Sequence, residues 1–269
     1  MNGLLKRLDF LWDIIYPASC IHCDLPMPSA EGIFCAHCKA NVIPLSQLAC
    51  SICDLPFVSE AATSHSPSHY CGDCHKDQPP FSKAITPFFY EGPLATAICK
   101  FKYEKKSHLA KPLGTMLADH LPPMDVDFVT AIPLHPNRLR NREFNQSLLL
   151  AREVSRLRKI PLLIDEMVRV KETVPQVGLH HKEREENIKG AFHVIREAAV
   201  RNFRILLIDD VYTTGATLKE GAKRLMRAGA KEVIVATIAR MMPPGWSPHV
   251  PRENAHRQDA CATSSQRAH

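Results

Sequence analysis

The chain has 269 residues, of which 45% are hydrophobic and 23% are charged, and its formal net charge is +6. This length predicts one or two domains, and the hydrophobic content suffices for a core in a segment of about 160 residues. No run of about eighteen apolar residues occurs, which excludes a transmembrane helix and predicts no membrane insertion. Since no convincing secretion signal is present either, we expect a cytoplasmic protein.

The first residues predict an amphipathic helix rather than a signal peptide. Lys6 and Arg7 precede an apolar stretch, as in a signal peptide, but Asp9 and Asp13 interrupt that stretch. The apolar positions between residues 4 and 15 recur at helical spacing. We therefore expect this helix to pack on a domain.

Eight of the ten cysteines lie in four Cys-x2-Cys knuckles. Two knuckles together supply four thiolates, which form a tetrahedron around zinc at a Zn–S distance of about 2.3 Å, so the spacing predicts two structural zinc sites. The simplest pairing of knuckles is sequential, and a cross-braced pairing is the alternative. The predicted ligands are Cys20, Cys23, Cys35 and Cys38 for one zinc and Cys50, Cys53, Cys71 and Cys74 for the other.

Other roles for these cysteines are less favoured. Disulfides require an oxidising compartment, and an iron–sulfur cluster usually has its ligands in a tighter run. His22, His37 and His75 lie inside or beside knuckles and could replace a cysteine ligand, although eight cysteines already complete two sites.

Composition and charge divide the chain into three parts. Residues 1–80 carry a net charge of −4 and are rich in Pro, Ser and Cys, so zinc must supply folding free energy to this helix and double zinc ribbon. Residues 81–240 carry a net charge of +9 and contain the main apolar segments. Residues 241–269 are polar and without periodicity, which predicts a disordered tail.

Within residues 81–240 the apolar pattern alternates between strand and helix. We expect strands at 84–90, 128–132, 203–208 and 232–238, and helices near 94–101, 109–120, 144–157 and 218–228. This alternation predicts an α/β fold, a parallel sheet with helices on both faces. A polar insertion over residues 173–192 is predicted to close over the active site as a lid.

Three arginines, Arg138, Arg140 and Arg142, crowd the segment that follows the strand 128–132, which we expect to be a loop. Guanidinium groups bind phosphate oxygens bidentately, so this loop suits pyrophosphate or another polyanion. The alternative is a solvated basic loop with no ligand.

The most informative segment is residues 206–217, where a buried strand leads into an acidic pair and a glycine turn rich in hydroxyl groups. Asp209 and Asp210 follow the strand at its carboxyl end, where open α/β sheets bind ligands. The turn from Thr213 to Thr217 precedes a helix, and its N–H groups and hydroxyls suit a phosphate. The carboxylates can accept hydrogen bonds from two ribose hydroxyls while the turn holds the 5′-phosphate. The alternative is an ordinary strand-turn-helix in which an Asp caps the helix.

This segment resembles the phosphoribosyl pyrophosphate (PRPP) motif of type I phosphoribosyltransferases. Together with the knuckles, Pro133-Leu134-His135-Pro136 and Phe144-Asn145-Gln146, it makes residues 10–240 similar to the ComF/GntX family. The resemblance implies a double zinc ribbon joined to a type I phosphoribosyltransferase domain, in a family linked to natural competence and use of extracellular DNA. Glu143 departs from the family, which usually has glycine there.

The resemblance implies a PRPP site with Asp209 and Asp210 as catalytic residues that orient the ribose. Magnesium would bridge pyrophosphate and ribose oxygens, and the arginines would neutralise the leaving pyrophosphate. The predicted PRPP-binding residues are Asp209, Asp210, Val211, Tyr212, Thr213, Thr214, Gly215, Ala216, Thr217, Arg138, Arg140 and Arg142.

The sequence leaves a second function open, that of a non-catalytic PRPP sensor or a single-stranded-DNA-binding competence factor working with the DNA-uptake machinery. The +9 segment and the aromatic residues between Lys100 and Tyr103 favour DNA binding. The acidic ribbons, which are poor in aromatics, argue against it.

Overall fold

The computed structural model describes residues 18–28, 32–45, 48–57, 69–173 and 186–243. Three predictions lie outside these residues, wholly or in large part. They are the amphipathic helix at 4–15, the stretch 174–185 of the expected lid and the tail beyond residue 243. Among the described residues, no helix is both long and apolar enough to cross a membrane.

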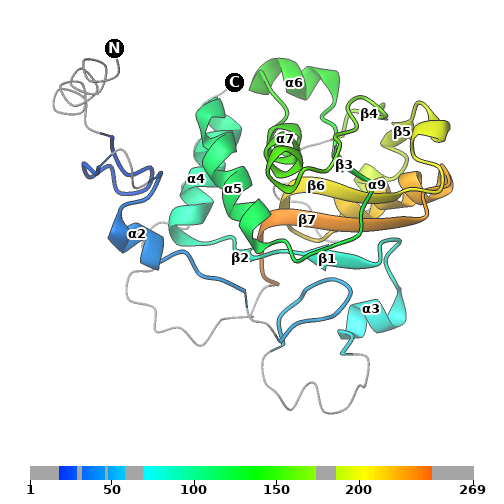
Figure 1. Cartoon of the computed structure of the whole chain (residues 1–269), viewed down its shortest axis with the longest axis horizontal. Coiled ribbons are helices and arrows are strands. Elements are labelled where there is room, and N and C mark those ends of the chain that lie inside the picture. The colour runs from blue at the N-terminus through cyan, green and yellow to red at the C-terminus, as the bar shows by residue number, and fades with distance from the viewer. Residues whose placement is uncertain (1–17, 29–31, 46–47, 58–68, 174–185, 244–269) are drawn as a thin grey trace.

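A parallel sheet lies at the centre of the larger part of the chain (Figure 1). Its strand order is β1-β7-β6-β3. Strand β2 also pairs with β7, at Ala239 and Arg240, which follow the residues that pair with β1. Every pair in this sheet is parallel. The strands are β1 (Lys83–Ile85), β2 (Phe88–Phe89), β3 (Phe128–Ala131), β6 (Arg204–Tyr212) and β7 (Glu232–Arg240).

Helices cover both faces of the sheet, as the alternating pattern predicts (Figure 1). On one face Leu206 and Ile208 of β6 join a core cluster with α4 (Gly92–Tyr103), α5 (Ala110–His120) and α7 (Gln146–Arg158). On the other face Ile205 and Leu207 join a second cluster with α9 (Ala216–Arg227). Because successive residues of a strand point to opposite faces, one unbroken apolar run supplies both cores.

The structure differs from the predicted elements at two places near the sheet. The single strand expected at 84–90 is two short strands, because Pro87 cannot donate to the ladder and the Thr86 N–H donates to Asp54 Oδ2 instead (2.6 Å). Strand β6 continues to Tyr212, so Asp209 and Asp210 lie within the strand rather than beyond its end.

The arginine segment is a helix and not the loop that we predicted. Helix α6 (Pro136–Arg142) has Pro136 at its first position, and His135 Nδ1 accepts a hydrogen bond from Asn137 N (3.3 Å) as the N-cap. It ends at Glu143, whose φ of +68° is left-handed. Glycine adopts that conformation without steric cost, so the glycine that the resemblance implies at this position would suit this helix end.

A small antiparallel sheet stands apart from the parallel one and was not predicted. It pairs β4 (Met167–Arg169) with β5 (Phe192–Val194), and a short 3-10 helix, η4 (Glu197–Ala199), follows. Another 3-10 turn, η3 (Ser107–Leu109), leads into α5. Three-residue strands in a polar segment carry too little hydrophobic periodicity to be recognised from sequence.

The cysteine-rich part packs against the sheet domain at two places (Figure 1). The knuckle residues Cys20 and Cys38, the latter in α2 (Ala36–Ala40), belong to the core cluster of α4, α5 and α7. The second knuckle pair, with α3 (Gly72–Lys76), belongs to the cluster of α9. The backbone of this pair also joins the sheet edge, since Ala84 N donates to Ile52 O (2.6 Å).

Candidate functional site

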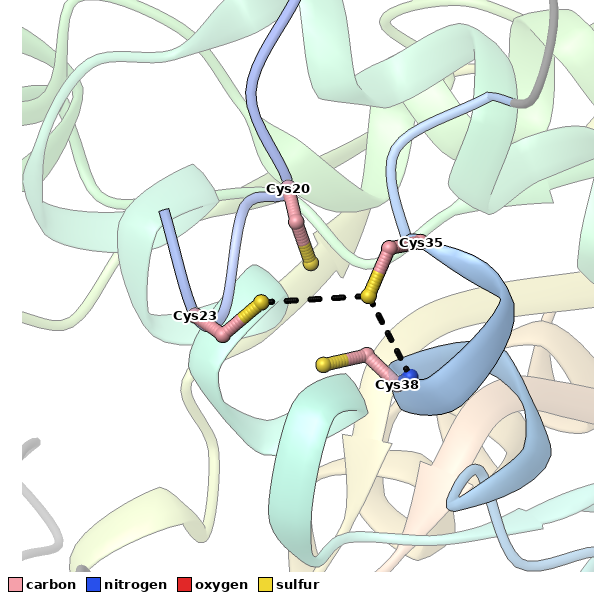
Figure 2. A group of neighbouring side chains, drawn as sticks. All are labelled: Cys20, Cys23, Cys35 and Cys38. Atoms are coloured by element: carbon pink, nitrogen blue, oxygen red, sulfur yellow. Dashed lines mark hydrogen bonds between the residues drawn. The ribbon is translucent and has the colours of Figure 1, made fainter. Parts of the chain in front are cut away.

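Two cysteine tetrads are present, and their grouping is sequential. In each tetrad the four sulfur atoms lie within 4.8 Å of one another. The first contains Cys20, Cys23, Cys35 and Cys38 (Figure 2), and the second contains Cys50, Cys53, Cys71 and Cys74. The cross-braced alternative is therefore excluded.

The sulfur spacing fits tetrahedral zinc. Cys23 Sγ lies 3.8 Å from Cys35 Sγ, and Cys53 Sγ lies 3.6 Å from Cys71 Sγ. A tetrahedron with Zn–S bonds of about 2.3 Å has sulfur atoms about 3.8 Å apart. All nine described cysteines are free thiols, which agrees with metal ligation rather than disulfides. Four thiolates leave no position for substrate, so both zinc sites are structural.

The two ribbons are structural repeats of each other. The sequence Cys-x2-Cys-Asp-Leu-Pro occurs at residues 20–26 and again at 50–56. Asp24 and Asp54 have left-handed φ angles of 59° and 61°, and each donates its N–H to the carbonyl oxygen of the first cysteine of its knuckle (both 2.9 Å). The Asp-Leu-Pro that follows each knuckle is therefore a second sequence signal for two equivalent metal sites, in addition to the cysteine spacing.

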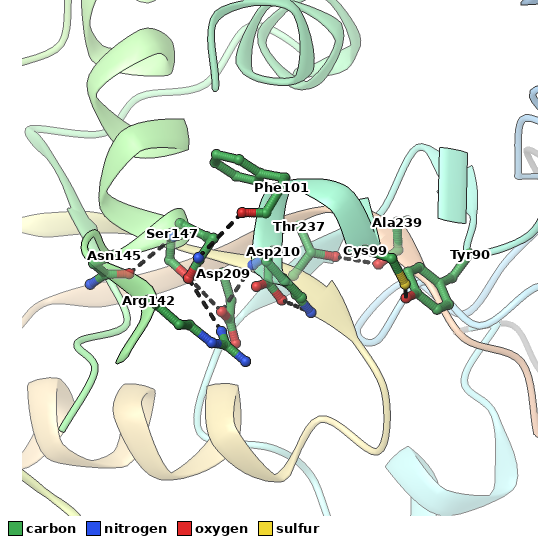
Figure 3. Close-up of polar contacts among 12 residues, drawn as sticks. Tyr90, Cys99, Phe101, Arg142, Asn145, Ser147, Asp209, Asp210, Thr237 and Ala239 are labelled. Atoms are coloured by element: carbon green, nitrogen blue, oxygen red, sulfur yellow. Dashed lines mark hydrogen bonds and ion pairs between the residues drawn. The ribbon is translucent and has the colours of Figure 1, made fainter. Parts of the chain in front are cut away.

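The acidic pair of β6 is held by two helices. Ser147 Oγ donates to Asp209 Oδ1 (2.7 Å), and the Asp210 N–H donates to the same oxygen (2.9 Å) (Figure 3). Ser147 lies in the first turn of α7, where Asn145 caps the helix by accepting from Ser147 N (3.1 Å). The Asn145 amide also donates to Ile132 O (3.0 Å), which ties the start of α7 to the end of β3.

Asp210 has a different partner from Asp209. Lys102, on the last turn of α4, places Nζ 2.8 Å from Asp210 Oδ1, and the two side chains are only 16% and 13% exposed. Burial lowers the pKa of Lys102, but the Asp210 carboxylate outweighs that effect, and the net shift is upward. The lysine therefore stays charged and forms a shielded ion pair with Asp210.

Asp209 has a pKa that is unusual for an aspartate. Burial raises its pKa to about 7, and the adjacent Asp210 carboxylate acts in the same direction. The hydrogen bonds from Ser147 and from the Asp210 N–H, and the charge of Lys102, oppose the rise. At neutral pH Asp209 can thus exchange a proton, whereas its neighbour is engaged in an ion pair.

The turn of residues 213–217 leads directly into α9. Helix α9 begins at Ala216, slightly before the predicted start near 218, with Gly215 as its N-cap, and Thr217 lies inside the first turn. Gly215 has a φ of +78°, a conformation that favours glycine. A helix leaves its first amides without partners inside the helix, and its dipole favours an anion there. Here Ala216 N donates to Thr214 Oγ1 (3.4 Å).

The three predicted arginines separate on helix α6. Arg138 Nη2 donates to Thr173 O (2.7 Å), and Arg142 Nη1 donates to Gln146 Oε1 (3.2 Å), with its guanidinium 5.2 Å from the Tyr103 ring centroid. Arg140 is exposed and donates to Asn137 on its own helix (3.1 Å). Arg138 and Arg142 are thus partly buried and contact other elements, whereas Arg140 is on the surface.

A fourth arginine, Arg169 of β4, completes the basic cluster. It is 6% exposed, its guanidinium lies 5.6 Å from the Phe192 ring centroid, and its Nε has no hydrogen-bond partner among the described residues. Burial lowers its pKa to about 10, and the charges of Arg138 and Arg142 add to that effect while Asp209 opposes it. A buried guanidinium with an unpaired donor beside two like charges is ready to bind an anion.

Sequence reasoning missed Lys102, Ser147 and Arg169. No motif contains them together, because they come from α4, α7 and β4. An isolated Lys or Ser in a helical pattern carries no signal of its own. Only Arg169, one charged residue in an apolar triplet, could have been noticed from the sequence.

Two family models match the chain, a double zinc ribbon domain at residues 11–75 and a phosphoribosyl transferase domain at residues 145–250. Competence protein F of Haemophilus influenzae is 32% identical over 222 residues, which cover 77% of this chain and 96% of that protein. The chain belongs to the ComF/GntX family. This membership confirms the double zinc ribbon and the phosphoribosyltransferase fold expected from the motifs.

A second relative of this ComF-family protein agrees. DNA utilization protein YhgH of Escherichia coli K12 is 30% identical over 233 residues, which cover 84% of this chain and 98% of that protein. The solved structure of adenine phosphoribosyltransferase from Thermoanaerobacter pseudethanolicus covers 61% of this chain and 93% of its own, at 13% identity and a TM-score of 0.34. The fold of the ComF-family chain is therefore assigned from the family models and the parallel sheet.

Proposed function

We propose that this protein binds PRPP with Mg²⁺ at the carboxyl edge of β6 and acts in DNA uptake, natural transformation or the use of extracellular DNA. The observation that carries the proposal is the convergence of three groups on one edge: the Asp209–Asp210 pair, the turn before α9, and the basic cluster of arginines. In PRPP the ribose hydroxyls lie between a 5′-phosphate and a pyrophosphate. Carboxylates between two anion-binding groups therefore suit this ligand. The names of the relatives support the biological role.

In this proposal the two carboxylates have different tasks. Asp210, paired with Lys102, accepts a hydrogen bond from one ribose hydroxyl. Asp209, oriented by Ser147, accepts from the other. The Gly215 turn and the first amides of α9 bind the 5′-phosphate. When bound, Mg²⁺ supplies positive charge to the pyrophosphate and ribose oxygens.

The direct test is calorimetric titration of PRPP with magnesium into the zinc-loaded protein. We expect one site per chain, and we expect binding to fall below detection when Asp209→Asn and Asp210→Asn are combined. Ribose 5-phosphate with magnesium should bind more weakly, because it lacks the pyrophosphate that the arginines contact. Equal PRPP affinity in the double variant would contradict the proposed site.

The arginine cluster gives a second prediction. We expect Arg169→Met to weaken PRPP binding roughly 10- to 100-fold, since one charge-assisted hydrogen-bonding group contributes about 1.5–3 kcal/mol. Arg140→Met is the matched control, because Arg140 is exposed and bonds only its own helix among the described residues. Titration of pyrophosphate into both variants shows which of the two arginines, Arg169 or Arg140, binds the pyrophosphate group. A larger effect at Arg140 than at Arg169 would contradict this assignment.

Single-stranded DNA binding is a second candidate function that one observation favours. Tyr103 is 37% exposed beside the site and carries the Arg142 guanidinium on its ring, an arrangement on which a base can stack. If the protein binds DNA, affinity should fall steeply as salt rises. No detectable binding at low salt would exclude this function.

A further inference from the structure

The second cysteine tetrad lies close to the turn that would bind the 5′-phosphate, although the two are far apart in sequence. All four of its cysteines are buried, and they share a core cluster with Tyr212 and with Ala216 and Leu218 of α9. The described cysteines of the first tetrad belong to the other cluster, with α4, α5 and α7. Of the two zinc sites, the second therefore shares a core cluster with residues of the turn and the first does not.

One buried arginine connects the second tetrad to β6. Arg240, the last residue of β7, is 6% exposed, and its Nη1 donates to the carbonyl oxygen of Cys53. Its Nε has no hydrogen-bond partner among the described residues. A zinc ion with four thiolates carries a net charge of about −2, so a fixed cation beside it is electrostatically favoured. Electrostatic attraction to the zinc-bound tetrad thus keeps the Arg240 guanidinium next to it.

The same arginine lies on the tyrosine that supports the turn. Its guanidinium carbon is 4.1 Å from the ring centroid of Tyr212, which pairs with Arg240 across β6 and β7. Tyr212 is 3% exposed and packs closely against Gly215: a Cβ built on that glycine would lie 2.4 Å from the tyrosine oxygen. The ring therefore forms the surface on which the left-handed Gly215 turn rests.

From these contacts we propose that Arg240 and Tyr212 are positioning residues that couple the second zinc site to the turn of residues 213–217. Loss of zinc from the second tetrad frees its four cysteines from a common centre and loosens the Cys53 carbonyl, so Arg240 loses its anchor. Tyr212 then loses its cation–π partner, and Gly215 loses its support. Zinc occupancy at the second site would thereby set the order of the turn and the affinity for a phosphate.

Hydrogen–deuterium exchange of the amides of residues 212–217 tests this coupling without any ligand. With zinc in excess, Arg240→Met should retain two zinc ions per chain and exchange about tenfold faster in this segment, whereas Arg240→Lys should show an intermediate rate. Arg204→Met is the matched control, because Arg204 is at the opposite end of β6 and pairs with Asp125 and Glu232. Unchanged exchange in Arg240→Met would overturn the proposal.

Ligand removal at each tetrad gives an independent comparison. Cys53→Ser should accelerate exchange at residues 212–217 more than Cys23→Ser, although each variant loses one zinc ion. Equal acceleration in both would mean that zinc loss acts through general destabilisation and would overturn the coupling. If Cys53→Ser does not fold, the Arg240 variants decide alone.

PRPP binding provides the last readout and rests on the proposed function. We expect Arg240→Met to lower PRPP affinity about tenfold at full zinc occupancy. Absence of PRPP binding in the unaltered protein would contradict the proposed function but not the coupling, which the exchange rates report. Faster exchange together with unchanged PRPP affinity would overturn the claim that the coupling reaches the ligand.

Discussion

Removing both zinc ions should lower the thermal midpoint of the protein by at least about 20 °C. In small zinc modules the metal contributes about 10 kcal/mol or more of folding free energy, and 1 kcal/mol corresponds to about 2–4 °C in a domain of this size. Here the effect should extend beyond the ribbons, because the second tetrad forms part of the core cluster of α9. Calorimetry before and after treatment with a zinc-selective chelator measures the change.

Two controls accompany the chelation experiment. A thiol reductant in the presence of zinc should leave the midpoint unchanged, because no described cysteine forms a disulfide. Re-adding two equivalents of zinc should restore the original midpoint. Release of both metal ions with an unchanged midpoint would show that the tetrads do not stabilise the fold.

The second large effect should come from Asp209→Asn, which we expect to stabilise the folded protein at neutral pH. The pKa of Asp209 is raised from 3.8 to about 7, so the folded state binds this proton more tightly than the unfolded chain does. Between about pH 4 and pH 7 the unfolded state has already lost the proton, and the free energy of unfolding therefore falls as pH rises through this window. The loss at pH 7.5 is roughly 2–4 kcal/mol, which asparagine avoids.

Urea unfolding of both proteins at several pH values measures this contribution. The difference in unfolding free energy between Asp209→Asn and the unaltered protein should grow from near zero at about pH 4 to its full value at about pH 7.5. Taking the difference cancels titrations that the two proteins share, including that of the zinc thiolates. Asp119→Asn, an exposed change on α5, is the control for a generic Asp-to-Asn effect. A pH-independent difference would mean that Asp209 titrates normally.

Such a gain would show that Asp209 lowers the stability of the folded protein. Two adjacent carboxylates in a partly buried part of β6 repel each other, and among the described residues only Asp210 has a lysine partner. Under the proposed function one ribose hydroxyl would supply a further hydrogen bond to Asp209. Stability and ligand binding should therefore change in opposite directions in the Asp209→Asn variant.

Much of the architecture could be read from local patterns. The knuckle spacing identifies the zinc ligands, because Cys-x2-Cys places two thiolates on one side of a tight turn. The run at 205–208 predicts a buried parallel strand, because a strand covered on both faces has no polar alternation. Local signals failed where a helix is short. Segment 136–142 was expected to be a loop, and only the N-cap His135 and the helix-starting Pro136 indicate otherwise.

The sequence by itself therefore determined the zinc ligands, the α/β fold and the acidic pair with its glycine turn, since each depends on residues that are neighbours along the chain. Tertiary structure alone decided the knuckle pairing, the convergence of Lys102, Ser147 and Arg169 on that pair, and the outward direction of Arg140. The convergence joins segments that are far apart along the chain, and its geometry depends on how helices pack on the sheet, which local spacing does not encode.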